Sequence, residues 1–258
     1  MPDDTRRLAA AYDEVAYRPE ILEYFGHSEF LNFGYWEETT ANQKQACENL
    51  MEKLLSFIPD KRGAILDVAC GKGATTQYLT RYYPPQCIIG INISARQLET
   101  ARSINPGCTF YLMDAVHLEF ADAFLDNIIC VEAAFHFHTR EQFLKEAYRV
   151  LKPGGRLVLS DILMTREAEK TRKRPGGNFV ENLEEYRAIW RSAGFQASTI
   201  IDVTEPCWAG HFWHRVRYLH QKFLAREIEL AEMIAGLEPT YKRVPDIRSY
   251  LLAWGQKL

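Results

Sequence analysis

Short runs of apolar residues alternate with segments of helical periodicity from Ala64 onward. The runs are four to six residues long and nearly all apolar, with many isoleucine and valine residues. Such runs are typical of strands in a parallel sheet that helices cover on both faces, built from strand–helix–strand units. The expected strands are 64–69, 87–91, 109–112, 127–131 and 156–160.

Three segments between these runs carry apolar residues three and four positions apart, which is typical of helices with one buried face. In the last segment Phe143, Ala147 and Val150 share a face. Pro153 and the two glycines after it end that helix and turn the chain into the next strand. The expected helices are 76–83, 95–103 and 141–151.

Further elements are expected on both sides of this core. Residues 5–57 have the pattern of helices interrupted by an aromatic segment, Phe30-Leu-Asn-Phe-Gly-Tyr-Trp36. A long C-terminal helix is expected because its apolar residues form one stripe. The elements expected after the core are a basic Pro/Gly loop (172–177), a helix (181–193), a strand (196–203), the long helix (211–236) and an edge or hairpin strand (249–254).

Composition narrows the possible functions. The chain has 258 residues, 47% apolar, which is enough for one sizeable core. A net charge of -3 gives no general attraction for a polyanion, so we expect no nucleic acid partner unless the basic residues 170–174 form a patch. The six cysteines are irregularly spaced, the N-terminus is polar and no apolar run is long enough to span a bilayer. We therefore expect a soluble, cytoplasmic protein without a membrane span.

A glycine-rich turn follows the first expected strand, in Asp67-Val-Ala-Cys-Gly-Lys-Gly73. Such a turn presents backbone N–H groups and a helix N-terminus to a ligand, and glycine allows the ligand to approach closely. A dinucleotide-binding turn would carry a third glycine where this chain has Thr76. A pyrophosphate ligand is therefore the weaker interpretation of this turn.

The same seven residues resemble the first motif of class I S-adenosylmethionine (SAM)-dependent methyltransferases. Later motifs of that family are matched in order by segments 89–94, 113–120, 131–136 and 149–155. The chain is similar to the small-molecule carbon and oxygen methyltransferases, including tocopherol methyltransferase and cyclopropane synthases. The resemblance implies a Rossmann-like sheet of seven mostly parallel strands with helices on both faces, N-terminal helices and a C-terminal helical lid insertion. It implies a single domain over 1–258, with a helical cap (1–60), a SAM-binding core (61–165) and a lid with the last strands (166–258).

The resemblance places the methionine end of SAM at the glycine turn. The ammonium of SAM needs acceptors and its carboxylate needs N–H donors. Asp67 could instead cap the end of its strand. Tyr35, in the aromatic segment, is a candidate donor to the SAM carboxylate, or else packs on the core. The remaining residues implied here are Ala69, Cys70, Gly71 and Gly73.

The ends of the next two strands are implied to bind ribose and adenine. The family usually has an acidic ribose ligand where this chain has Asn92, with Ile93 beside it. Asn can still accept and donate, and Gln97 is expected to share the ribose unless it is an exposed helix residue. Asp114 would accept from the adenine amine, while the Ala115 N–H would donate to the ring.

Three residues near the end of the fourth and fifth strands could take part in the chemistry. Glu132 could stabilise the SAM cation, orient a substrate group or cap the next helix. His136 is the leading candidate base because histidine titrates near neutral pH, and a buried structural role is the alternative. Some relatives carry the first His of a His-His pair where this chain has Phe135. Asp161 follows the fifth strand, so a His136–Asp161 relay is a further hypothesis.

Aromatic residues are expected to bind the acceptor, because their density suits a flat or apolar molecule. The candidates are Trp36, Phe135, Trp208, His211 and Trp213. His211 and His214 lie three apart but lack a third spaced ligand, so we expect no metal site.

The sequence thus predicts a SAM-dependent methyltransferase that acts at carbon or oxygen of a small metabolite or natural product and releases S-adenosylhomocysteine (SAH). The acceptor would be aromatic, polyketide-like or isoprenoid, and a prenyl diphosphate would be favoured if residues 170–174 line the pocket. Alternatives are N-methylation, a non-methylating reaction such as cyclisation, or SAM binding alone. A homodimer is left open.

Overall fold

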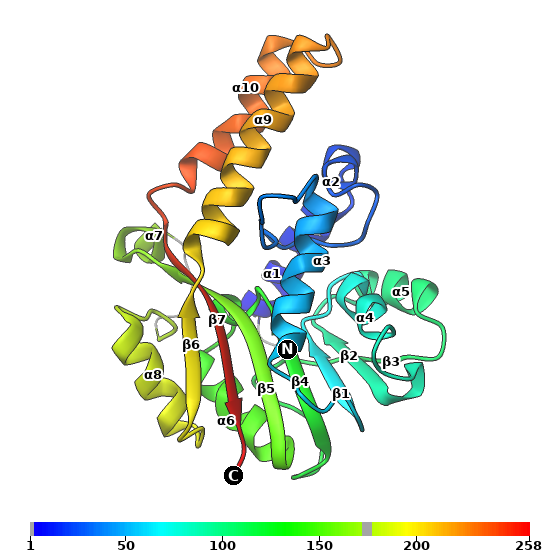
Figure 1. The fold of residues 1–258 in the computed structure, drawn as a ribbon, viewed down its shortest axis with the longest axis vertical. Helices are drawn as coiled ribbons and strands as arrows, with labels where there is room; N and C mark the ends of the chain where they lie inside the picture. The colour runs from blue at the N-terminus through cyan, green and yellow to red at the C-terminus, as the bar shows by residue number, and fades with distance from the viewer. Residues whose placement is uncertain (1–2, 172–176) are drawn as a thin grey trace.

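The computed structural model describes residues 3–171 and 177–258 and shows a seven-stranded sheet (Figure 1). The strand order is β3-β2-β1-β4-β5-β7-β6, and β7 runs antiparallel to both of its neighbours. The expected mostly parallel α/β fold is confirmed. The strands are β1 (Ile65–Val68), β2 (Ile88–Asn92), β3 (Thr109–Leu112), β4 (Leu125–Val131), β5 (Leu151–Met164), β6 (Ser198–Asp202) and β7 (Ile247–Gln256).

Apolar side chains of the strands alternate between two helical layers. Leu66 and Val68 pack in the cluster that holds α6 and α8, whereas Ile65 packs with α3 and α4 on the opposite face. Burying one such side chain contributes about 1.5–3 kcal/mol. The helices are α1 (Asp3–Ala16), α2 (Pro19–Tyr24), α3 (Gln43–Ser56), α4 (Ala74–Leu79), α5 (Ala95–Ile104), α6 (Arg140–Val150), α7 (Arg166–Thr171), α8 (Leu183–Ser192), α9 (Gly210–Leu224) and α10 (Leu230–Lys242). Short helical turns are η1 (Pro85–Cys87), η2 (Ala134–His136) and η3 (Glu205–Ala209).

Register brings the ends of the central strands together. Val68 of β1 lies opposite Ile91 of β2 and Cys130 of β4, and all three strands are parallel. The residues that follow these strands therefore meet at one edge of the sheet. The strand order also reverses between β1 and β4, which is where α/β sheets bind ligands.

Two expectations for the C-terminal third are wrong. The long helix expected at 211–236 is two helices, because Arg226 adopts a left-handed conformation (φ 60°) and Glu229 starts α10 in a capping box with Glu232. In Figure 1 the resulting pair, α9 and α10, projects beyond the end of the sheet. The last strand is not an edge, since β7 lies between β5 and β6. Residues 172–176 of the expected basic loop lie outside the described residues.

Candidate SAM and acceptor site

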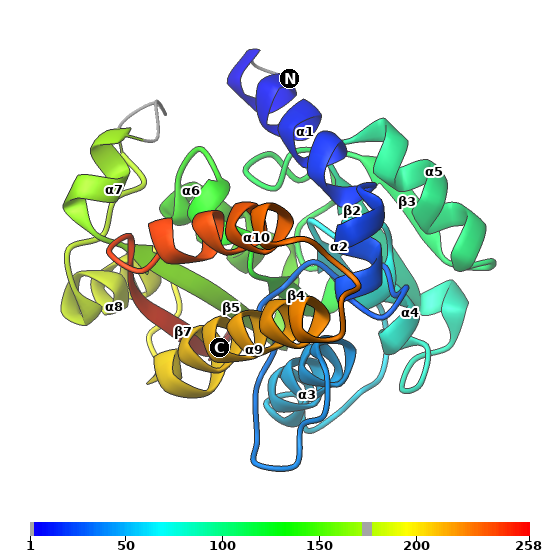
Figure 2. The ribbon, with the colours of Figure 1, turned by 90° about the horizontal axis from the view of Figure 1, so that it is seen from above.

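A pocket lies at the carboxyl ends of the central strands, beneath α1. It is lined by residues that directly follow β1, β2 and β3 and by the end of β4, as the reversal of strand order predicts. Seen from above, α1 passes over the region of β2 (Figure 2). The implied cofactor residues found in the lining are Ala69, Cys70, Gly71, Asn92, Ile93, Gln97, Asp114, Ala115 and Glu132.

The glycine turn has an unusual backbone. Ala69, Gly71 and Gly73 have positive φ angles of 57°, 56° and 92°. Alternation of left-handed residues with ordinary ones turns successive N–H groups to one side, forming a concave site for anions. A Cβ on Gly73 would lie 2.9 Å from Cα and Cβ of Ala101, so this glycine also allows α5 to pack closely. Gly73 itself lies behind the pocket and is not among its lining residues.

Asp67 lies buried directly behind this turn. Its Oδ2 accepts hydrogen bonds from the hydroxyls of Thr75 and Thr76, both at 2.6 Å. Among the described residues, no group donates to its buried Oδ1. Burial raises the pKa of this carboxyl to about 6, against the two threonine bonds that lower it. A buried acceptor without a donor is costly, and a cationic or N–H-bearing ligand would satisfy it.

The side chains after β2 form a hydrogen-bonded set. Asn92 Nδ2 donates to Gln97 Oε1 at 3.0 Å and to the carbonyl oxygen of Gly71 at 3.3 Å. Gln97 is buried, so the reading of it as an exposed helix residue is wrong. Both side chains line the pocket.

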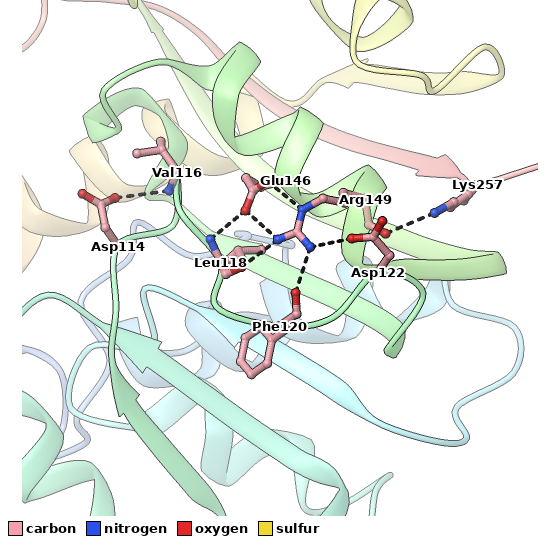
Figure 3. A network of polar contacts seen from close by, with 8 residues as sticks. All are labelled: Asp114, Val116, Leu118, Phe120, Asp122, Glu146, Arg149 and Lys257. Carbon is pink, nitrogen blue, oxygen red and sulfur yellow. Dashed lines mark hydrogen bonds and ion pairs between the residues drawn. The ribbon is translucent and has the colours of Figure 1, made fainter.

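The loop that carries Asp114 and Ala115 is held by a single guanidinium (Figure 3). Arg149 of α6 donates to the carbonyl oxygens of Leu118 at 2.7 Å and Phe120 at 2.8 Å. It also pairs with Asp122 and Glu146, each at 2.8 Å. Arg149 was recognised in the sequence only as part of a motif, and its contacts now show that it positions the loop after β3.

We expect Arg149→Met to loosen this loop. Loss of several charge-assisted hydrogen bonds should lower the free energy of unfolding by about 1–3 kcal/mol. The affinity for SAM, measured by calorimetry, should fall about tenfold because the loop residues lose their fixed position. Lys145→Met is a suitable control, because Lys145 is an exposed neighbour on α6 whose ammonium pairs with Glu141. Unchanged affinity in Arg149→Met would contradict the positioning role.

Glu132 closes the far side of the pocket. Its backbone is in the left-handed region (φ 52°), which is uncommon for a residue with a side chain and turns the chain sharply after β4. Its Oε2 accepts from the N–H of Phe33 and from the hydroxyl of Tyr250, both at 2.8 Å. Burial raises the pKa of Glu132 to about 7 in spite of these two bonds. The carboxyl thus binds the aromatic segment, and it does not act as a helix cap in any of these contacts.

His136 lies at the end of η2, and its Nε2 is hydrogen-bonded to the hydroxyl of Tyr12. The two rings meet edge to face, with centroids 5.2 Å apart. Both residues line the pocket, although they are 124 positions apart in the chain. The imidazole of His136 therefore faces the pocket, and the hydroxyl of Tyr12 on α1 orients it.

Asp161 does not form the expected relay with His136. Its carboxylate is buried and pairs with Arg140, whose Nε donates to Oδ2 at 2.6 Å. Tyr186 donates to the same oxygen at 3.0 Å, and the N–H of Ile162 donates to Oδ1 at 2.8 Å. The sequence interpretation is corrected here because both oxygens of Asp161 serve packing between β5, α6 and α8.

The five aromatic residues expected to bind the acceptor are not among the described lining of the pocket. For His211 the reason is Gln43, a buried amide that joins it to Tyr24 and to the aromatic segment. Its Oε1 lies 3.0 Å from the Tyr24 hydroxyl and 2.9 Å from Nδ1 of His211, while its Nε2 donates to the carbonyl oxygens of Asn32 and Phe33 at 2.9 and 3.1 Å. Tyr24, Phe33 and Trp208 belong to the core beside α3 and α9, and His211 stacks against Phe33 there.

Each of these residues has a partner that explains the correction. Trp36 stacks on His214 with ring centroids 4.2 Å apart, and Trp208 packs against Phe33 at 5.1 Å. Trp213 is 59% exposed. The others are His211, which stacks on Phe33, and Phe135, which packs against His136 and the core beside β5.

Tyr35 also lies away from the pocket. Its N–H donates to the carbonyl oxygen of Ala46, and its ring lies beneath the ammonium of Lys53, 4.8 Å from the ring centroid. Tyr35 is therefore corrected to a residue that packs on α3. The part of the aromatic segment that does reach the pocket is Phe30, Leu31 and Asn32.

The sequence did not identify the residues of α1 that cover the pocket. Thr5, Leu8, Ala9 and Tyr12 all line it. They occupy positions i, i+3, i+4 and i+7, which is the spacing of one helical face. That spacing was visible in the sequence, but it does not show which surface the face covers.

Within residues 3–171 and 177–258, no cluster of three or more His, Cys, Asp or Glu side chains could hold a metal. In the same residues, no helix combines the length and the apolar character needed to cross a membrane.

Comparison with known proteins identifies the family. Residues 66–159 match the family described as a methyltransferase domain. The chain is 32% identical over 219 residues to 27-O-demethylrifamycin SV methyltransferase of Amycolatopsis mediterranei, covering 78% of this chain and 79% of that one.

Solved structures share the whole fold. A geranyl diphosphate C-methyltransferase from Streptomyces coelicolor superposes with a TM-score of 0.75 over 100% of this chain and 99% of that one, at 14% identity. The [4+2]-cyclase SpnF gives 0.74 over 99% and 97%, at 22% identity. These likenesses establish the fold, and the sequence relatives establish the chemistry: the chain belongs to the class I SAM-dependent methyltransferases that act on small molecules.

Proposed function

We propose that this enzyme uses SAM to methylate a hydroxyl oxygen of a natural-product acceptor that carries no phosphate, with His136 as the base. The observation that carries the proposal is the His136–Tyr12 pair, which faces the pocket beside Glu132. SAM supplies an electrophilic methyl group on a sulfonium. The protein must then hold the acceptor in line, exclude water and remove one proton.

The residues present fit the cofactor. The unpartnered Oδ1 of Asp67 and the N–H groups of the glycine turn suit the ammonium and carboxylate of the methionine end. Asn92 and Gln97 would hold the ribose, and Asp114 with the N–H of Ala115 would hold the adenine. Glu132, at the end of β4, would lie nearest the positive sulfur. Tyr35 is excluded from this set because it packs on α3.

His136 would accept the proton of the acceptor hydroxyl through Nε2. The hydroxyl of Tyr12 is hydrogen-bonded at this nitrogen, so an acceptor hydroxyl would replace it or bond beside it. As the proton moves to the imidazole, the oxygen gains the electron density needed to form its bond to the methyl carbon. A hydroxyl acceptor is favoured over an amine because a neutral amine attacks without a base.

The charge of the pocket favours an acceptor without phosphate. Asp4, Asp114 and Glu132 line it together with Glu29, which Lys72 neutralises, while the described lining contains no Lys or Arg. An anionic acceptor would need cationic side chains that offset the free energy of its desolvation. The earlier expectation of a prenyl diphosphate depended on residues 170–174, of which 172–176 lie outside the described residues.

Binding of SAM should release protons near pH 6. The folded-state pKa values of Asp67 (about 6) and Glu132 (about 7) lie above their usual values of 3.8 and 4.5. The fold by itself therefore binds more protons than the unfolded chain between about pH 4 and 7, so its stability should fall as pH rises through this range, by about 3 kcal/mol per group at most. A cationic ligand favours the ionised carboxylates, so affinity for SAM should rise over the same range.

Calorimetry in two buffers of different ionisation enthalpy would count these protons. At pH 6 we expect SAM to release more protons than SAH, because SAH keeps the ammonium near Asp67 but lacks the sulfonium near Glu132. Asp67→Asn should abolish the release that the two ligands share. Equal and negligible proton release for both ligands would contradict the placement.

The acceptor itself can be identified by mass spectrometry. The protein is incubated with methyl-labelled SAM and a panel of phenols, macrolide-type alcohols, amines and prenyl diphosphates. Label on an oxygen of an unphosphorylated product would support the proposal. Label on a phosphorylated acceptor would contradict the charge argument, and SAM binding with an unmethylated, cyclised product would support the cyclase alternative.

A further inference from the structure

Asp13, near the carboxyl end of α1, is hydrogen-bonded to the side of the pocket that is proposed to hold the ribose. Its Oδ1 accepts hydrogen bonds from Ser94 Oγ at 2.7 Å and from Gln97 Nε2 at 2.8 Å. Ser94 and Gln97 are both buried and both line the pocket. A carboxylate from the cap thus reaches the end of β2, where the strand itself ends in Asn92 rather than an acid.

Lys72 of the glycine turn is hydrogen-bonded to the same end of α1. This side chain is 1% exposed although it stands between Gly71 and Gly73. Its ammonium donates to the carbonyl oxygen of Ala16, the last residue of α1, at 2.7 Å. It also pairs with Glu29, which precedes the pocket-lining part of the aromatic segment. The helix dipole favours a cation at this end of α1.

These two anchors are linked through the cofactor residues. Gln97 is held at both ends of its amide, by Asp13 at Nε2 and by Asn92 at Oε1. Asn92 in turn donates to the carbonyl oxygen of Gly71 at 3.3 Å. A continuous path of hydrogen bonds therefore runs from α1 to the glycine turn through the two side chains proposed to hold the ribose.

We propose that Asp13 and Lys72 are positioning residues through which SAM binding and closure of α1 over the pocket favour each other. The proposal rests on the placement of SAM given above. A ligand that fixes Asn92 and Gln97 in their observed orientation also fixes the amide of Gln97, which donates to Asp13. Binding of the ligand therefore stabilises the closed position of α1. Because Tyr12 lies on the same helix, its contact with His136 forms only when α1 is closed. The base is thus assembled, and water excluded, when the cofactor is in place.

The test measures closure and binding separately, without methyl transfer. Trypsin can cut after Arg6 and Arg7, which lie within α1. Cleavage rates at these sites are measured with and without saturating SAH, and the Kd of SAH is measured by calorimetry. In the wild type SAH should slow cleavage about tenfold, as expected when charge-assisted hydrogen bonds favour closure. In Asp13→Ala and Lys72→Met, the protection that SAH gives against cleavage should fall to about twofold or less. The Kd of SAH should rise by the factor by which this protection is lost, because coupling between closure and binding is reciprocal.

Matched controls separate coupling from loss of structure. Glu14→Ala removes an exposed acid one residue from Asp13, and Lys44→Met removes an exposed lysine; both should keep the full protection. A purely structural role would change cleavage by the same factor with and without SAH, and would leave the ratio intact. Asp13→Asn, which keeps one acceptor oxygen, should restore part of the protection even if Asp13→Ala unfolds.

Full SAH protection in Asp13→Ala and Lys72→Met would overturn the proposal, as would a raised Kd with unchanged protection. Absence of SAH binding in the wild type would refute both this inference and the cofactor placement. Coupling observed in a protein that methylates none of the acceptors would contradict the proposed function alone.

Discussion

Replacing His136 by Ala should lower kcat about 10²- to 10⁴-fold, the usual contribution of a positioned general base. The loss should appear with a hydroxyl acceptor, because the neutral hydroxyl oxygen is a weak nucleophile until its proton is removed. SAM binding should change much less than kcat, since the imidazole contacts Tyr12 and Phe135. Single-turnover rates together with calorimetry of SAM binding would separate the two effects.

Added imidazole gives a sharp control for the His136 prediction. A base in solution should restore part of the rate of His136→Ala, whereas it would not repair a distorted pocket. Tyr12→Phe should have a smaller effect, about tenfold, because it removes the hydrogen bond that orients the ring and leaves the base in place. His220→Gln, on the exposed face of α9, should behave as the wild type. A rate for His136→Ala within threefold of wild type would show that the methyl acceptor needs no base here.

The sequence was sufficient for the fold, because the fold depends on local patterns, and the resemblance to methyltransferases named most of the residues that line one end of the pocket. Strands β1 to β5 follow from apolar runs that only a sheet covered on both faces can bury. The positions of Gly71, Asn92 and Asp114 follow in turn, since parallel strands bring their carboxyl ends to one edge. Gln97 and Ser94 belong to the same local unit, in which Ser94 caps α5.

The acceptor side depends on contacts between distant segments, and the sequence pattern left it ambiguous. A cluster of Trp, Phe and His suits both a ligand site and a core, and a buried amide at Gln43 decides for the core. The apolar face of α1 was visible in its spacing, but whether it packs on the sheet or covers a pocket depends on anchors such as Lys72, 56 positions from the Ala16 carbonyl that it binds. Asp161 shows the same limit, because its position along β5 does not show that Arg140 will pair with it.

The second large effect on stability is expected at the buried ion pair of Arg140 and Asp161. Arg140 and Asp161 are 4% and 0% exposed, and the guanidinium also donates to the carbonyl oxygen of Ile162 at 2.7 Å. Arg140→Met would leave the buried carboxylate without its counter-charge. We expect this change to lower the free energy of unfolding by about 3–5 kcal/mol, the usual effect of breaking a buried ion pair. Chemical denaturation would measure it. Lys at this position should recover little, because an ammonium lacks the planar fork that contacts several oxygens at once.

Removing both charges distinguishes a structural pair from a catalytic acid. Arg140→Met with Asp161→Asn leaves no unpaired charge, so the double variant should be more stable than Arg140→Met alone, with a coupling of about 1–3 kcal/mol. Arg191→Met, in an exposed pair with Glu184, should cost less than about 1 kcal/mol. The guanidinium of Arg140 also donates to the carbonyl oxygen of Asn178, and Asn178 lines the pocket, so Arg140→Met should also raise the KM for the acceptor. A folded double variant that keeps its kcat would show that Asp161 holds the pocket wall and transfers no proton, whereas a 10²-fold loss of kcat at wild-type stability would restore Asp161 as a catalytic acid.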